Sequence, residues 1–188
     1  MIDCLKQKLE LIEQAHINEI SFFNKLGLSS VFDRLDADWK DQCDKYGEFY
    51  DKCPNFSASR GILGGEIFFV PDCQYYQTVF DLMPENAIVL DAGAGDLRFA
   101  MALSTKVKLV YAVEINPTII GRALSVIGYD LPINVITICT DCFRYEIPTD
   151  VTDISCIMIH RAHKFPKSWL TKRIVHAEFD GVHIVGDK

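Results

Sequence analysis

The chain has 188 residues, with 19 lysines and arginines against 26 aspartates and glutamates, which gives a formal net charge of −7. Hydrophobic residues make up 49% and charged residues 24%, values typical of a globular protein with a substantial core and unlike those of a disordered chain. The acidic balance disfavours broad electrostatic binding to nucleic acid. No segment approaches the roughly 18 uncharged apolar residues that a membrane helix needs. The 7 cysteines are an odd number in a chain without a secretion signal, so we expect reduced thiols and a cytoplasmic protein.

Apolar residues at three- and four-residue spacings predict two amphipathic helices near the N-terminus, over residues 3–26 and 30–51. The stretch that follows, residues 53–71, is rich in proline, glycine, serine and asparagine, which favour turns. We therefore expect residues 1–60 to form a helical extension that helps to cover the site, and residues 61–188 to form the main domain.

Beyond Pro84, short runs rich in β-branched residues alternate with helical stretches. This alternation predicts the α/β class, with a doubly wound, mostly parallel sheet of about five strands. The expected strands cover residues 87–91, 109–114, 135–140, 154–160 and 182–185. The expected helices of this part cover residues 72–83, 96–104, 117–127 and 166–177.

The most informative segment lies at the end of the first predicted strand. There Asp91 is followed by Gly93 and Gly95, and a helix is expected from Asp96. Two glycines one residue apart let the backbone turn sharply and approach a ligand closely. The segment therefore predicts a loop that cradles a nucleotide-type ligand.

Acidic residues also end the next two predicted strands. Glu114 lies 23 residues beyond Asp91, where a carboxylate can accept hydrogen bonds from both ribose hydroxyls. Asp141 ends the third strand, where it can accept from an exocyclic amine such as that of adenine. Because ligands of open parallel sheets bind beyond the carboxyl ends of the strands, we expect the three acids to face one crevice.

Charge distinguishes the candidate ligands of this crevice. A pyrophosphate binds a helix N-terminus free of negative charge, since its amide groups and dipole attract anions. Here Asp91 and Asp96 flank that terminus, and Arg98 occupies the third glycine position of the dinucleotide-binding pattern. We interpret Asp96 as a helix cap rather than a ligand-binding residue. A ligand with an amino group and a cationic sulfonium suits these acids better, and S-adenosylmethionine has both beside its adenosine.

The pattern of Asp91, Gly93 and Gly95 resembles the first motif of the class I S-adenosylmethionine-dependent methyltransferases. The resemblance covers roughly half of the chain, and three motifs agree in order and spacing. It implies a Rossmann-like methyltransferase fold, S-adenosylmethionine as the cofactor, and a cofactor site built from Asp91, Ala92, Gly93, Gly95, Glu114, Ile115, Asp141 and Cys142.

The same resemblance implies a role for each part of that site. Asp91 and the glycine loop would hold the methionine moiety, and Glu114 would hold the ribose. Ile115 would pack on the adenine ring. Asp141, with the backbone of Cys142, would read the adenine edge.

A narrower similarity concerns two groups of protein lysine methyltransferases: those that modify the ATP synthase c-subunit and, more distantly, the histone group that lacks a SET domain. The segments 95–98 and 114–117 look like the corresponding stretches of those enzymes. Val70 and Pro71 resemble the start of their Val-Pro-Thr entry loop, although Asp72 stands where a hydroxyl residue is expected.

His160 is the candidate catalytic residue. It would end the fourth strand, where the family positions the methyl acceptor, and its near-neutral ordinary pKa suits a general base. The alternative is a strand-end histidine with an ordinary hydrogen bond.

Two paired spacings suggest a metal site, because Cys139 and Cys142 form C-x-x-C, and His160 and His163 form H-x-x-H. In the usual strand order 3-2-1-4-5, however, the third and fourth strand ends lie roughly 14 Å apart, too far for one metal ion. We therefore expect no metal.

Together these features predict an S-adenosylmethionine-dependent methyltransferase that acts on protein lysine or a small molecule rather than on nucleic acid. A non-catalytic sensor or scaffold that binds S-adenosylmethionine is the alternative, and a nicotinamide-dependent oxidoreductase is a third possibility. The last predicted strand, residues 182–185, would leave an open sheet edge, and open edges invite pairing. We expect a homodimer through this edge, unless the N-terminal extension covers it.

Overall fold

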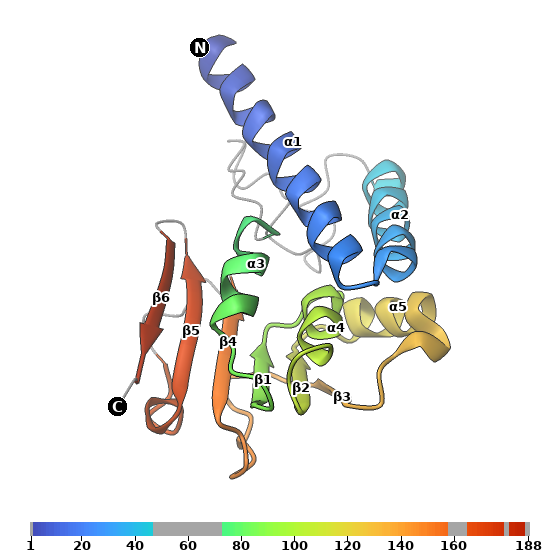
Figure 1. The fold of residues 1–188 in the computed structure, drawn as a ribbon. Helices are drawn as coiled ribbons and strands as arrows, with labels where there is room; N and C mark the ends of the chain where they lie inside the picture. Colours follow the sequence, from blue (N-terminus) through green and yellow to red (C-terminus); the bar gives the residue numbers. More distant parts are fainter. Residues whose placement is uncertain (1, 47–72, 158–164, 179–180, 187–188) are drawn as a thin grey trace.

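The computed structural model describes residues 2–46, 73–157, 165–178 and 181–186. Its centre is a sheet of 6 strands in the order β3-β2-β1-β4-β5-β6 (Figure 1). The strands are β1 (Ile88–Ala92), β2 (Leu109–Glu114), β3 (Val135–Cys139), β4 (Asp153–Ile157), β5 (Arg173–Glu178) and β6 (Gly181–Val185). Strands β1 to β5 run parallel, and β6 pairs antiparallel with β5. The predicted α/β class with a mostly parallel sheet is confirmed.

Helices cover one face of the sheet in two layers, as Figure 1 shows. The helices α3 (Cys73–Leu82), α4 (Arg98–Ser104) and α5 (Pro117–Ile127) pack against the strands. The helices α1 (Ile2–Lys25) and α2 (Ser29–Tyr46) pack outside them, α1 against α3 and α2 against α5. One continuous core joins side chains of all five helices to the sheet, including Phe23, Phe32, Val79, Leu103 and Val110.

The other face of the sheet is covered by irregular segments in the described part of the chain. Phe143 and Tyr145, from the connection between β3 and β4, pack there with Trp169 of a short 3-10 turn (Trp169–Thr171). The Trp169 ring is fully buried and stacks on Phe143 and Phe165, with ring centroids 5.3 and 5.7 Å apart. Aromatic side chains thus provide the packing that a helix would otherwise supply.

The predicted helix over residues 166–177 is wrong. This segment holds the 3-10 turn and then β5, whose central residues are buried on both faces of the sheet. A short apolar run such as Ile174-Val175 does not distinguish a buried strand from a buried helix by its periodicity. As a consequence the predicted last strand is the sixth, and it is antiparallel at the edge of the sheet.

The remaining predicted elements agree with the structure, with shifts of one or two residues at most ends. The helix expected from Asp96 begins at Arg98. The ends of two predicted elements, residues 47–51 and 158–160, lie outside the described residues. Among the described helices, none is long and apolar enough to cross a membrane.

Candidate functional site

Asp91 is a buried carboxylate near the carboxyl end of β1, where it lies beside Ala112 of β2 and Ser155 of β4. Only 3% of Asp91 is exposed. Its Oδ1 accepts a hydrogen bond of 2.6 Å from the Ser155 hydroxyl, whereas its buried Oδ2 has no hydrogen-bond partner. Burial raises the pKa of Asp91 to about 6; the Ser155 hydrogen bond opposes the shift and the charge of Glu114 adds to it. The strand thus presents a carboxyl group that titrates near neutral pH and has one unpaired oxygen.

The loop after β1 turns through left-handed backbone conformations. Gly93 has φ 73° and Gly95 has φ 55°, which explains why glycine stands at both positions. The N–H groups of Gly93 and Ala94 donate to the Val113 carbonyl at 2.8 and 3.0 Å, and so attach the loop to β2. Leu97 is also left-handed, with φ 67°, although it carries a buried side chain.

Glu114, at the end of β2, fixes the same loop from the other side. Its Oε2 accepts from the Gly95 N–H at 3.1 Å, and its Oε1 accepts from the Asn116 N–H at 2.9 Å. The next residue, Ile115, is 64% exposed. Asn116 then caps α5, because its Oδ1 accepts from the Thr118 N–H at 2.9 Å.

Asp141 and Cys142 follow β3. Asp141 Oδ1 accepts from the Phe143 N–H at 3.0 Å, and Cys142 is buried. Burial raises the pKa of the Cys142 thiol to about 12, and the charges of Asp141 and Glu114 add to the shift. Glu114 contributes to the raised pKa of both Asp91 and Cys142, and Asp91, Glu114 and Asp141 lie at or just after the carboxyl ends of the neighbouring strands β1, β2 and β3. The acidic residues that the sequence singled out therefore follow three neighbouring strands at the same edge of the sheet.

Comparison with solved structures supplies the decisive observation on the fold. Trm5b from Pyrococcus abyssi is 26% identical over 61% of this chain and 37% of its own, with a TM-score of 0.50. TYW2 from M. jannaschii, solved in complex with AdoMet, is 25% identical over 62% of this chain and 56% of its own, with a TM-score of 0.47. The 23S rRNA methyltransferase ErmE is 14% identical over 55% and 46%, with a TM-score of 0.46. This chain has the class I S-adenosylmethionine-dependent methyltransferase fold.

The match extends over only part of each protein. The chain spans 37% to 56% of the lengths of these three structures. Its sequence matches no protein-family model and no curated protein. The likeness thus concerns the fold.

Within the methyltransferase fold, the expected catalytic residue cannot be placed. His160 belongs to residues 158–164, outside the described part of the chain. The last described residue of β4, Ile157, belongs to the strand beside β1. His160 therefore follows the strand that neighbours Asp91, and its role stays a prediction.

The cysteine pair of the zinc hypothesis lies around the end of β3. Cys139 is exposed and Cys142 is buried, and both are free thiols. In the sheet, β2 and β1 separate β3 from β4, as the predicted strand order required. No group of three potential metal ligands lies together among the described residues.

Asp96 lies two residues before Arg98, the first residue of α4, and contacts it. Its Oδ1 accepts from the Arg98 N–H at 3.3 Å, and its carboxylate also pairs with the Arg98 guanidinium, with Nε–Oδ2 at 2.8 Å. The N-cap of α4 is Leu97, which makes no side-chain cap hydrogen bond, so the expected cap at Asp96 is wrong. The same guanidinium also pairs with Glu19 and lies 3.9 Å from Asp36, so one positive charge faces three carboxylates, and the negative charge that the sequence predicts at this helix start is not cancelled.

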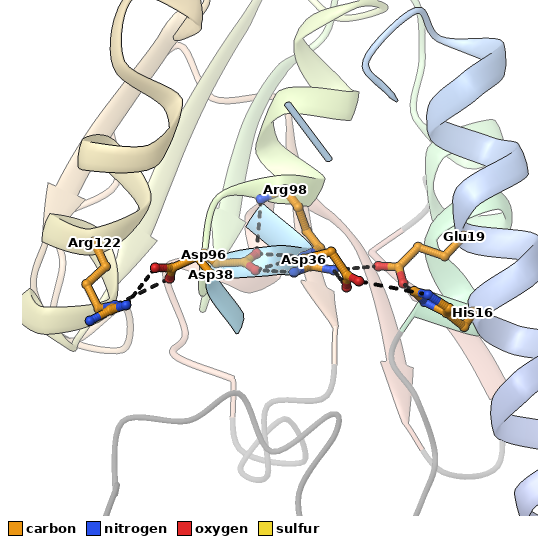
Figure 2. Close-up of polar contacts among 7 residues, drawn as sticks. All are labelled: His16, Glu19, Asp36, Asp38, Asp96, Arg98 and Arg122. Atoms are coloured by element: carbon orange, nitrogen blue, oxygen red, sulfur yellow. Dashed lines mark hydrogen bonds and ion pairs between the residues drawn. The ribbon is translucent and has the colours of Figure 1, made fainter. Parts of the chain in front are cut away.

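Arg98 itself is the residue whose importance the sequence analysis missed. It is 4% exposed and contacts Asp96 together with Glu19 of α1 (Figure 2). The available signal was a charged residue directly before the apolar run of residues 99–103. A buried arginine needs acidic partners, and these partners come from distant parts of the sequence.

Proposed function

We propose that the chain binds S-adenosylmethionine at the carboxyl ends of β1, β2 and β3 and transfers its methyl group to an acceptor. The observation that carries this proposal is the buried Asp91 carboxyl, with an unpartnered Oδ2 directly before the left-handed glycine loop. A buried carboxylate oxygen without a partner is costly, and a bound cation would remove that cost. The amino group of the methionine moiety is such a cation.

The neighbouring residues suit the rest of the same ligand. Each Glu114 oxygen accepts one main-chain N–H and keeps a lone pair that can accept from a ribose hydroxyl. Exposed Ile115 offers an apolar surface for adenine. Asp141 and the backbone of Cys142 would contact the adenine edge. Gly93 and Gly95, with Ala92 before them, would let the backbone approach the methionine part.

The charge pattern favours this ligand over a dinucleotide. Arg98, at the third glycine position, directs its guanidinium to Asp96 and to Glu19 of α1. With its charge held by these carboxylates, Arg98 is poorly placed to bind a pyrophosphate, and Asp91 and Glu114 would repel one.

The cofactor, when bound, supplies an electrophilic methyl group. The contribution of the protein to such a displacement is alignment of the acceptor with that group. Asp91 and Glu114 would fix the cofactor from two strands. His160, after β4, would take a proton from an acceptor that must lose one before attack, such as a lysine ammonium group.

For the acceptor, we propose a protein lysine or a small molecule. The net charge of −7 opposes the approach of a polyanion, whereas a cationic side chain would be attracted. Nucleic acid therefore remains the less favoured acceptor.

Calorimetry on the full chain with S-adenosylmethionine, its demethylated product and NAD tests the cofactor. We expect binding of the first two, loss of at least roughly tenfold in affinity in Asp91→Asn, and no binding of NAD. Glu146→Gln removes an equivalent charge at an exposed position between β3 and β4 and should bind like the parent. Tight binding of NAD, or unchanged affinity in Asp91→Asn, would contradict the proposal.

Transfer itself requires a second measurement. Incubation with a labelled methyl donor and a cell extract should give label in protein or in a small-molecule fraction. Binding of the cofactor without any transfer would favour the non-catalytic sensor instead.

A further inference from the structure

A buried ionic cluster connects the N-terminal helices to the glycine loop, and Arg98 lies at its centre (Figure 2). Arg98 Nη1 donates to Glu19 Oε1 of α1 at 2.9 Å, and Nη2 donates to Asp96 Oδ2 at 2.5 Å. Glu19 is 1% exposed. Asp36 of α2 has its Oδ1 3.9 Å from the same Nη1. One guanidinium thus joins three segments of the chain.

Two further side chains complete the cluster. The His16 ring lies between the acids, with Nδ1 3.4 Å from Glu19 Oε2 and Nε2 3.9 Å from Asp36 Oδ2. The Phe32 ring faces the guanidinium, 5.5 Å from its carbon to the ring centroid. Buried ion pairs are weak contributors to net stability, but their directed hydrogen bonds select one arrangement of the groups they join.

The glycine loop is held on two sides. On the sheet side, Gly93 and Ala94 donate to the Val113 carbonyl, and Gly95 donates to Glu114. On the helix side, Asp96 is fixed by Arg98, next to the left-handed Leu97. A left-handed non-glycine residue persists where its surroundings over-determine it, and here the surroundings include Arg98.

We propose that Arg98 is a positioning residue for the cofactor site. Its contacts with Glu19 and Asp96 fix the glycine loop, which would hold the methionine moiety, relative to α1. This inference rests on the proposed function. It makes Glu19, 79 residues before Arg98, a determinant of cofactor affinity although it lies on another element and pairs with the guanidinium rather than with the loop. The N-terminal helices are then a fixed part of the site rather than a separate cover.

The chain offers a matched control for a purely structural role. Arg122 of α5 pairs with Asp38 of α2, with Nη2–Oδ1 at 2.6 Å and Nε–Oδ2 at 3.3 Å (Figure 2). This pair also fastens an N-terminal helix to the main domain, but neither residue bonds to the glycine loop. Arg122→Gln therefore weakens the attachment of α2 and removes neither the Glu19 nor the Asp96 contact of Arg98.

The test compares Glu19→Gln, Asp96→Asn, their double variant and Arg122→Gln in the full chain. Affinities for S-adenosylmethionine and for its demethylated product are measured by calorimetry, and the melting temperature of each variant is recorded. We expect each single variant of the cluster to lose roughly tenfold in affinity, because a displaced loop no longer meets the ligand. The double variant should lose no more than the weaker-binding single variant, since both changes break one chain of contacts.

The two ligands separate positioning from a direct effect of charge. The demethylated product lacks the positive sulfur, so a displaced loop weakens both ligands equally. If Asp96→Asn weakens only S-adenosylmethionine, the Asp96 charge acts directly and the positioning role is wrong. If Glu19→Gln binds both ligands like the parent, or if Arg122→Gln loses as much affinity as Glu19→Gln, Arg98 serves stability alone.

Amide hydrogen exchange gives a readout that needs no ligand. In Glu19→Gln, the Gly95 and Leu97 amides should exchange roughly tenfold faster than in the parent, whereas Arg122→Gln should leave them unchanged. A parent chain that binds no S-adenosylmethionine would contradict the proposed function. Exchange would then still decide whether Arg98 positions the loop, and unchanged rates in Glu19→Gln would overturn it.

Discussion

The Ser155 hydroxyl donates a hydrogen bond of 2.6 Å to Asp91 Oδ1, from β4 to β1 across the middle of the sheet. The other oxygen of Asp91, Oδ2, is buried without a partner. One oxygen of this carboxyl group is therefore fixed by the protein, and the other is the atom that we propose pairs with the amino group of the ligand. Because the pKa of Asp91 is about 6, this carboxyl group changes charge in a pH range that is accessible to stability and binding measurements.

Asp91→Asn should change how stability depends on pH. The folded pKa of about 6 lies above the ordinary value of 3.8, so the folded state holds this proton more tightly than the unfolded state. The stabilising contribution of the protonated group is complete below about pH 4 and is lost as the pH rises through 6. The variant escapes this loss, so from pH 4 to pH 7 its free energy of unfolding should gain about 2 kcal/mol relative to the parent.

Urea unfolding of both proteins at several pH values measures this difference. Asp150→Asn, at an exposed position before β4, provides the control and should follow the parent at every pH. Parallel curves for Asp91→Asn and the parent would show that Asp91 has an ordinary pKa.

Cofactor affinity should also depend on the titration of Asp91. It should increase as the pH rises, whereas the stability contribution of Asp91 decreases. The ligand amino group pairs with ionised Asp91, so affinity should fall by up to about tenfold per pH unit as the pH drops below 6. Calorimetry in buffers of different ionisation enthalpy should detect proton release on binding near pH 6. Asp91→Asn should bind weakly and without this pH dependence. A parent profile that matches the variant profile would exclude Asp91 as the partner of the amino group.

The sequence was most informative where function depends on local backbone geometry. Asp91, Gly93 and Gly95 lie within five residues, and their spacing reports a strand end followed by left-handed turns, which the structure contains. Glu114 was also found, because carboxyl ends of neighbouring parallel strands meet at one edge. Its second task, accepting the Gly95 N–H, depends on how the two strands approach each other and is not visible in the spacing.

Contacts between side chains that are far apart in the sequence could not be predicted from it. Nothing in the pattern around Arg98 indicates that one of its carboxylate partners is Glu19, because that contact exists only once α1 packs against α3 in the folded chain. The wrong prediction of a helix over residues 166–177, where the structure has β5, has a different cause. Ile174 and Val175 are both fully buried, and a strand covered on both faces loses the alternation that identifies strands.

Glu114→Gln should weaken both the fold and the ligand site. The amide NH₂ group must face either the Gly95 or the Asn116 N–H, so one half-buried donor loses its acceptor. We expect the free energy of unfolding to fall by about 1–3 kcal/mol. Cofactor affinity should fall by at least roughly tenfold, since a ribose acceptor is lost as well. Glu146→Gln is the matched control in both measurements, and equal behaviour of the two variants would remove Glu114 from the site.

The predicted homodimer can be tested at the outer edge of β6. That strand ends the sheet order, and Ile184 on it is 40% exposed. If two chains meet at this edge, Ile184→Lys places charges in the interface and should shift sedimentation toward the monomer. Leu170→Lys changes a residue that is 51% exposed in the 3-10 turn rather than on the edge strand, and should leave the mass unchanged. A parent that sediments as a monomer would contradict the dimer.

Two glycines flank β6 and allow its placement to be tested. Gly186 has φ 83°, and a Cβ there would lie 2.3 Å from the Lys172 carbonyl oxygen. Gly181 has φ 141°, and nothing lies within 4 Å of its Cβ position. Both alanine variants impose backbone strain, but only Gly186→Ala adds a backbone overlap that no side-chain rotation relieves. Its free energy of unfolding should therefore fall by about 2 kcal/mol more than that of Gly181→Ala. Equal losses in urea unfolding would mean that the end of β6 does not lie against the residue that precedes β5.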